Sequence, residues 1–283
     1  MKWRATSSQN IIAFLQSVGS IDASGKFLRK VLEANLCRVN GRVERFGSTR
    51  LEKGDWVELA PEWQELAKVA PLQFPILYED ALCQIVDKPA GWVCSDPSCR
   101  KTFGPKLFLV HRLDKDTTGA LLLAKGLQAR EELMALFAAR QVDKEYIALV
   151  DGLVRENKGV RESFLAKKRL FEGQTIWSQG EEAITFWEVL QRGKDATYVR
   201  CQPLTGRTHQ IRVHMAELSH PLIVDRQYGE KLRSRYFAKR PLLHAQRLRF
   251  TVDGTTVDVR APLPEDLLHV ALRAGIAQPH ALL

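Results

Sequence analysis

Apolar residues change their spacing along the chain, and the change separates two regions. In "NIIAFLQSVGS" (10–20) and "KFLRKVLEANL" (26–36) they recur at helical spacing, which predicts two helices. From 37 to 60 the period shortens, and Asn40-Gly41 stands between two β-prone runs, which is typical of a tight hairpin. The pattern therefore predicts a small α+β domain over residues 1–60.

The remainder of the chain reads mainly as strands. Residues 61–74 contain two prolines and no regular period, which predicts a linker. Strand patterns then follow at 76–88, on both sides of 111–116, and at 143–153, 184–204 and 242–262, with helical patterns at 127–141 and 207–218. The predicted fold class of residues 75–283 is α+β, with a mixed, mainly antiparallel sheet and flanking helices.

Charge and targeting patterns narrow the function. The chain has 42 Lys and Arg against 33 Asp and Glu, a net charge of +9, which favours a polyanionic partner. The first residues show no cleavable signal pattern, and no apolar run reaches membrane-spanning length. We therefore expect a soluble, cytoplasmic protein that does not bind membranes.

The cysteines do not suggest a metal site. Five cysteines in a chain of 283 residues are typical of reduced thiols. Cys94 and Cys99 lack a second Cys/His pair, and His209 and His214 are five residues apart, unlike two ligands on one helix face. We expect no bound metal.

The stretch "LFLVHRLDKDTTGALLLAK" (107–125) places a charged loop between two apolar runs that read as buried strands. From this pattern alone, a charged hairpin turn and a functional loop are both open interpretations, because turns collect Asp and Lys.

Five segments give the chain a resemblance to a known family. They are "KPAG" (88–91), "HRLDKDTTG" (111–119), "KEY" (144–146), "TGRTHQIRVHM" (205–215) and "PLLHA" (241–245). In this order they resemble the RluA-type pseudouridine synthases, over residues 75–262. The resemblance implies the pseudouridine synthase fold and an isomerisation that breaks the N1–C1′ bond of a uridine in RNA, turns the base and joins C5 to C1′. No cofactor is needed for this reaction.

The resemblance also implies catalytic roles. Asp114 is the implied nucleophile or base. Arg212 is its implied ion-pair partner, and a planar, bidentate guanidinium would fix the direction of the carboxylate. Tyr146 is the implied ring that stacks on the uracil, with its hydroxyl available for proton removal from C5.

Three further residues are implied in substrate binding. Arg112 would hold open the RNA after the target uridine leaves its stack. Leu243 is the implied apolar wall under the uracil, and Arg207 is assigned to the substrate site with them. His111 is expected to support the loop.

The first 60 residues resemble the RNA-binding module named after the fourth protein of the ribosomal small subunit, the S4-like domain. Its implied RNA contacts are Lys26, Arg29, Lys30, Arg38 and Arg42. Three departures from the family patterns stand out: "SGKFLRK" replaces a Ser-Arg pair, Thr118 replaces Ser, and Val224 replaces Gly.

The expected function is pseudouridine synthesis in ribosomal RNA, in particular that of the large subunit. Transfer RNA is the alternative substrate. A catalytically silent RNA-binding protein is a second hypothesis, and a glycoside hydrolase using Asp114 and Asp116 is a third, disfavoured because residues in a turn have no fixed carboxylate separation.

Overall fold

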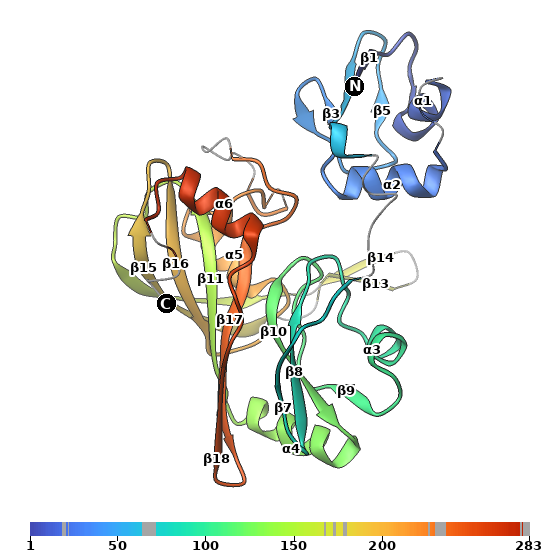
Figure 1. Cartoon of the computed structure of the whole chain (residues 1–283). Coiled ribbons are helices and arrows are strands. Elements are labelled where there is room, and N and C mark those ends of the chain that lie inside the picture. The colour runs from blue at the N-terminus through green and yellow to red at the C-terminus, as the bar shows by residue number, and fades with distance from the viewer. Residues whose placement is uncertain are drawn as a thin grey trace. The chain divides into compact units, whose positions relative to one another are not determined.

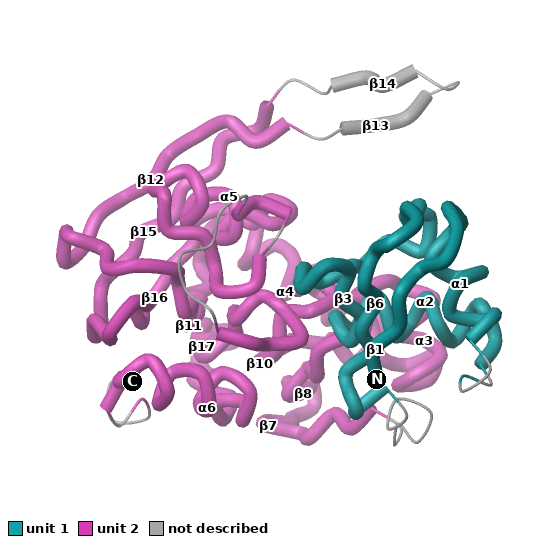
Figure 2. The backbone as a smooth tube through the Cα atoms, turned by 90° about the horizontal axis from the view of Figure 1, so that it is seen from above, with its two compact units in different colours: residues 1–71 teal, residues 72–283 magenta. Residues whose placement is uncertain are grey.

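The fold was obtained as a computed structural model (Figure 1), which describes residues 1–18, 21, 23–63, 72–166, 168–171, 174–177, 180–225, 227–229, 236–277 and 279. It divides into two compact units, Met1–Pro71 and Leu72–Leu283 (Figure 2). The division falls inside the predicted linker. Of that segment, 61–63 form the short helix η1 (Pro61–Trp63), 64–71 lie outside the described residues, and Phe74 packs against Trp92 and Phe103 of the second unit.

Unit 1 contains the two predicted helices, α1 (Ile11–Ser17) and α2 (Gly25–Glu33). Both begin at a capping side chain, since Asn10 accepts a hydrogen bond from Ile12 N–H and Ser24 accepts one from Phe27 N–H. Its strands are β1 (Lys2–Arg4), β2 (Gln9–Asn10), β3 (Cys37–Val39), β4 (Arg42–Val43), β5 (Arg50–Leu51) and β6 (Trp56–Leu59). The four-stranded sheet has the order β1-β6-β3-β4, and β2 pairs with β5.

The predicted hairpin at Asn40-Gly41 is confirmed. These two residues join β3 to β4 with positive φ angles of 50° and 78°. A two-residue type I′ turn between twisted antiparallel strands needs positive φ at both positions, which Asn and Gly adopt at low cost.

Unit 2 is built on one large sheet with the order β12-β15-β16-β11-β17-β10-β8-β7, and β18 and β9 pair at its side with β17 and β10. The strands are β7 (Ile76–Glu79), β8 (Cys83–Lys88), β9 (Leu107–Leu109), β10 (Thr118–Lys125), β11 (Asp143–Asp151), β12 (Lys158–Leu165), β15 (Glu181–Arg192), β16 (Ala196–Pro203), β17 (Leu243–Val252) and β18 (Thr255–Arg260). A separate two-stranded ladder joins β13 (Lys168–Phe171) to β14 (Gln174–Trp177). Among the described ladders of the large sheet, only β10 with β17 is parallel. The predicted mixed, mainly antiparallel α+β fold is confirmed.

Helices cover both faces of this sheet (Figure 1). They are α3 (Asp96–Phe103), α4 (Leu127–Ala138), α5 (Gln210–Glu217) and α6 (Glu265–Arg273). Successive side chains of a strand point to opposite faces. In β11, Ile147 and Leu149 therefore pack in the cluster that contains α6, whereas Ala148 and Val150 pack with α5. In β10, Leu122 packs in the cluster that contains α4, whereas Leu121 and Leu123 pack in the cluster that contains α3.

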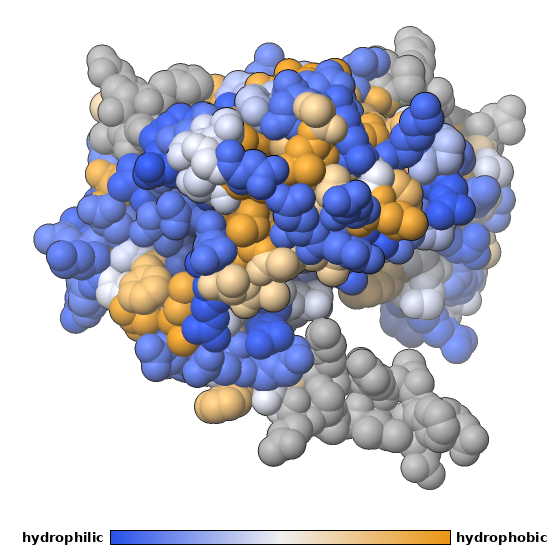
Figure 3. Space-filling view, turned by 90° about the horizontal axis from the view of Figure 1, so that it is seen from below, coloured by the Kyte–Doolittle hydropathy of each residue, from blue (hydrophilic) through white to orange (hydrophobic). Residues whose placement is uncertain are grey.

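Outside the core, the face seen in Figure 3 is mostly hydrophilic, with apolar residues in separate small groups. Within the described part of the chain, no helix is long and apolar enough to cross a membrane. The same residues contain no cluster of His, Cys, Asp or Glu suited to a metal ion. Cys94 and Cys99 are buried free thiols.

Candidate active site

Asp114 lies in the loop 110–117, which connects β9 to β10 where β10 runs parallel to β17. A turn closes the loop, because Thr117 N–H donates to the carbonyl of Asp114 over 3.1 Å. Immediately afterwards Gly119 has φ of 110°, and a Cβ at this position would lie 2.2 Å from the carbonyl oxygen of Ala245. The sequence therefore needs glycine here to bring the loop against the start of β17.

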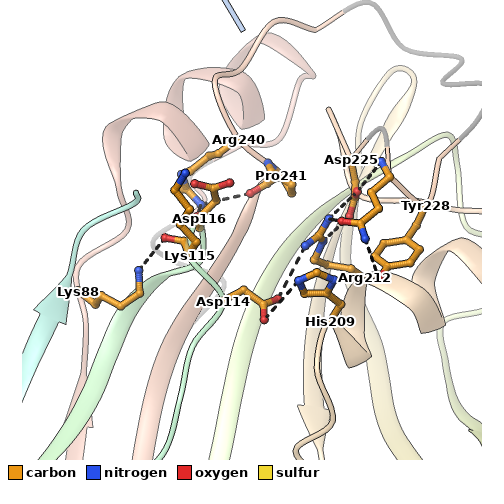
Figure 4. Close-up of polar contacts among 11 residues, drawn as sticks. Lys88, Asp114, Lys115, Asp116, His209, Arg212, Asp225, Tyr228, Arg240 and Pro241 are labelled. Carbon is orange, nitrogen blue, oxygen red and sulfur yellow. Dashed lines mark hydrogen bonds and ion pairs between the residues drawn. The ribbon is translucent and has the colours of Figure 1, made fainter. Parts of the chain in front are cut away.

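Backbone carbonyls anchor the loop to the "KPAG" segment (Figure 4). The carbonyl of Lys115 accepts hydrogen bonds from Lys88 Nζ and from Gly91 N–H, both over 2.9 Å. Lys88 is fully buried, and burial lowers its pKa to about 8. The "KPAG" segment thus anchors the Asp114 loop through the carbonyl of Lys115.

A second buried cation, Arg240, binds the other side of the loop. Its Nη1 donates to the carbonyls of Asp116 and Leu243, over 3.2 Å and 2.8 Å. Its Nε and Nη2 form a bidentate pair with Asp266 of α6, at 2.7 Å and 2.8 Å. One guanidinium therefore joins the Asp114 loop, the first residue of β17 and the last described helix.

His111 has the supporting role predicted for it. Its Nε2 accepts a hydrogen bond from Leu122 N–H over 3.0 Å, and its ring stacks on Phe137. Burial lowers the pKa of His111 to about 3, so the imidazole stays neutral and keeps this acceptor at physiological pH.

A cavity of about 600 Å³ opens beside the loop. Five residues predicted from the sequence line it: Arg112, Asp114, Tyr146, Arg207 and Leu243. Tyr146 from β11 and Leu243 from β17 supply apolar surface, whereas the arginines come from loops. Lys144, from the "KEY" segment but given no predicted role, and Arg140, outside the motifs, add two more cations to the lining.

Asp114 is partly accessible, with 23% of its side chain exposed. Tyr146 beside it has a pKa raised above its ordinary value, first by burial and then by the negative charge of Asp114. The carboxylate of Asp114, which is open to the cavity, therefore lies near a tyrosine whose hydroxyl keeps its proton.

The predicted ion pair of Arg212 with Asp114 is present, but the bidentate contact predicted for it is made with Asp225 instead. Arg212 directs Nε and Nη2 at Asp225, at 2.6 Å and 2.9 Å, and only its Nη1 approaches Asp114, at 4.0 Å (Figure 4). Asp225 has 1% of its side chain exposed and Arg212 has 11%, so each buried charge neutralises the other. Asp225 lies in "PLIVDRQYG" (221–229), and no sequence pattern indicated that it would pair with Arg212.

His209 is the second neighbour of Asp114 that sequence reasoning missed. It precedes α5 with φ of 57°, and its Nε2 lies 3.8 Å from Asp114 Oδ1. Its Nδ1 lies 2.8 Å from the hydroxyl of Tyr228. In the sequence, His209 was examined only as a possible metal ligand. Its position in "THQIR", the same segment as Arg212, was an available signal that it lies near Asp114.

Comparison with known proteins identifies the family. A sequence profile described as RNA pseudouridylate synthase matches residues 83–217. The chain is 30% identical to ribosomal large subunit pseudouridine synthase D of Pasteurella multocida, over 89% of this chain and 88% of that protein. It is 36% identical to ribosomal large subunit pseudouridine synthase C of Escherichia coli, over 77% and 78%. The chain belongs to the RNA pseudouridine synthase family.

The synthase is therefore an isomerase that converts uridine in RNA to pseudouridine, and RNA is its partner. Among solved structures it resembles the protein named Human RNA Pseudouridylate Synthase Domain Containing 4, with a TM-score of 0.60, 24% identity, and coverage of 71% of this chain and 92% of that one. This likeness concerns the fold. The matched range 83–217 contains Asp114, Tyr146 and Arg212, whereas Leu243, Arg240 and unit 1 lie outside it.

The residues predicted to contact RNA in unit 1 lie on α2, β3 and β4. Lys26, Arg29, Lys30 and Arg42 are exposed, and Arg38 is half-buried. The helix of this group presents its cations to solvent because Leu28, Val31 and Leu32 occupy its buried side.

Proposed function

We propose that this synthase modifies a uridine of large-subunit ribosomal RNA. Relatives with this named activity are 30% to 36% identical over most of the chain. The observation that carries the proposal is the carboxylate of Asp114, which opens into a cavity lined by Tyr146 and Leu243. Since ribosomal RNA occupies the cytoplasm of bacteria, as in these relatives' organisms, we place the protein there.

Asp114 is the proposed reacting group. As nucleophile or base it must approach C1′ or the base of a uridine that has left its stack. The loop anchors from Lys88 and Arg240 support this role because they bind the carbonyls of Lys115 and Asp116 and not the carboxylate of Asp114. Fixed geometry of this kind lowers the entropic part of a reaction barrier.

Tyr146 and Leu243 are proposed to hold the uracil between an aromatic ring and an apolar wall. The raised pKa of Tyr146 favours a phenol over a phenolate at neutral pH. We therefore propose that Tyr146 meets the uracil as a neutral phenol, which can stack on the base and donate a hydrogen bond. Loss of the negative charge of Asp114 during the reaction would remove one of the causes that raise this pKa, after burial, and would thereby favour proton removal from C5 by Tyr146.

Arg112 and Arg207 are proposed to contact the RNA around the flipped uridine. Arg112 is exposed and forms no ion pair or hydrogen bond with the described residues, so its guanidinium is available to bases and phosphates. Arg207 is already oriented by Glu181, 3.2 Å from its Nη1, and by the carbonyl of Glu182. The two arginines line the same cavity, as expected of groups that hold one nucleotide from two sides.

Unit 1 is proposed to be an S4-like RNA-binding domain. The support is the order of two helices followed by a hairpin and a strand, together with the exposed cations on α2 and β4. Each phosphate that such cations neutralise adds a salt-dependent contribution to affinity without sequence specificity.

The experiment is to map pseudouridines in ribosomal and transfer RNA from cells with the gene, without it, and with the gene encoding Asp114→Asn. A large-subunit position that is modified only with the parent gene supports the proposal. A lost position in transfer RNA instead would select the alternative substrate. Full modification with the Asp114→Asn gene would favour a silent RNA-binding role for this chain and another enzyme for the chemistry.

A further inference from the structure

A series of polar contacts leads from Arg212 back to Asp114 through the segment after α5 (Figure 4). Arg212 Nη2 donates to Gln227 Oε1 over 3.1 Å, and Gln227 Nε2 donates to the hydroxyl of Tyr228 over 3.2 Å. That hydroxyl lies 2.8 Å from His209 Nδ1. On the other side of the imidazole, Nε2 lies 3.8 Å from Asp114 Oδ1.

The direction of these hydrogen bonds follows from the guanidinium, which can only donate. Gln227 must turn its oxygen to Arg212, so its NH₂ group points to the oxygen of Tyr228. Because the phenolic oxygen already accepts this N–H, its own hydrogen is available for His209 Nδ1. A neutral imidazole that accepts at Nδ1 carries its single hydrogen on Nε2.

The environment of His209 supports the same tautomer. Burial lowers the pKa of His209, although the negative charge of Asp114 acts in the opposite direction. The lowered pKa favours the neutral ring. With the hydrogen on Nδ1, the Nε2 lone pair would face the carboxylate of Asp114. With the hydrogen on Nε2, an N–H dipole points at that anion, which is favourable although 3.8 Å is too long for a hydrogen bond.

We propose that His209 is a positioning residue for Asp114, held by Tyr228 in the tautomer that has its hydrogen on Nε2. This inference rests on the proposed role of Asp114 as the reacting group. His209 faces Oδ1 while Arg212 faces Oδ2 at 4.0 Å, so the two donors restrain both carboxylate oxygens. Gln227 and Tyr228 link these two donors to each other.

The tautomer can be measured directly in the full-length protein. In protein labelled with ¹⁵N in the imidazole rings, the signals of His209 among the seven histidines are those absent from His209→Gln. At neutral pH we expect a protonated Nε2 and an unprotonated Nδ1. A His209 ring with its hydrogen on Nδ1 would overturn the proposal whatever the activity.

Kinetics test the positioning role. In His209→Ala we expect kcat to fall about tenfold, which is about 1.4 kcal/mol of barrier, with an unchanged KM for RNA. His209→Gln should recover part of this loss, since its amide nitrogen can occupy the place of Nε2. Tyr228→Phe should lower kcat, yet the double variant Tyr228→Phe/His209→Ala should be no slower than His209→Ala alone, because Tyr228 acts through His209.

The control is Tyr236→Phe, which removes the hydroxyl that donates to Asp195 in another part of unit 2 and should leave kcat unchanged. Independent, multiplying effects of the His209 and Tyr228 changes would overturn the proposal, as would no recovery in His209→Gln. Tyr228→Phe alone decides the matter if His209→Ala does not fold, because a parent-like kcat contradicts the proposed coupling. An inactive parent enzyme would instead refute the proposed function.

Discussion

Replacement of Asp225 by Asn isolates the charge of the pair that holds Arg212. The variant keeps the size of the side chain but leaves a guanidinium that is 11% exposed without its counter-ion. Removing one partner of a buried ion pair costs about 3 to 5 kcal/mol of folding free energy. Release of the guanidinium also allows it to turn fully to Asp114, whose Oδ2 is already 4.0 Å from Nη1.

The chain offers a matched control in Asp258→Asn. Asp258 accepts a hydrogen bond from Arg247 Nε over 2.6 Å and a second from Nη2, but 40% of its side chain is exposed. An exposed pair contributes about 1 kcal/mol or less. Both variants share the chemical change and the bidentate geometry. They differ in burial and in the remaining anion, since Arg247 keeps Glu145 at 2.7 Å whereas Arg212 keeps Asp114 at 4.0 Å.

The assay is urea unfolding followed by circular dichroism, with turnover on RNA measured in parallel. Asp225→Asn should lower the unfolding midpoint by several times more than Asp258→Asn at an unchanged slope. It should also lower kcat more than tenfold, about 1.4 kcal/mol of barrier, whereas Asp258→Asn should keep parent turnover. Equal losses of stability in the two variants would refute the assignment of Asp225 as the buried counter-ion of Arg212.

Three other changes have expected outcomes. Arg212→Lys keeps a cation but loses the planar fork held by Asp225, so it should fold and bind RNA yet turn over far more slowly, and parent-like turnover would remove the need for that fork. Burial lowers the pKa of His244 from 6.5 to about 4, so the unfolded chain binds a proton below pH 6.5 that the folded chain does not. The contribution of His244 to the unfolding free energy is thus complete above pH 6.5 and decreases by about 2 kcal/mol at pH 5. Between these pH values the unfolding free energy of His244→Gln should fall less steeply with decreasing pH than that of the parent, by the uptake of one proton. The same slope in both proteins would contradict the shift. A chain starting at residue 72 should bind long RNA more weakly and with a shallower salt dependence, and an unchanged salt slope would show that unit 1 does not contact RNA.

The sequence predicted the elements that have a strong period or a specific turn. The hairpin at Asn40-Gly41 was predictable because its turn needs positive φ at both positions, which Asn and Gly adopt at low cost. Helix α3 was missed because "DPSCRKTF" has one buried side chain, Cys99, and therefore no apolar period. Ser95, which caps it, and Pro97 near its start were the available signals.

The site was predictable as a set of residues and less so as a geometry. The motifs named five residues that do line one cavity, contributed by four of the five segments. The partner of Arg212 was not predictable, because Asp114 and Asp225 are equally plausible anions until the fold fixes their distances. Val224 illustrates the same limit: its φ of 67° explains why glycine suits this position, but the angle comes only from the structure.

The most direct test of the central claim is turnover by Asp114→Asn, which preserves size while removing the negative charge. Tritium release from RNA containing 5-tritiated uridine is measured beside a binding titration. If Asp114 is the reacting group, release should cease while RNA affinity stays similar or rises, because one anion near a polyanion has gone. Sustained release within about tenfold of the parent rate, about 1.4 kcal/mol of barrier, would contradict the assignment of Asp114.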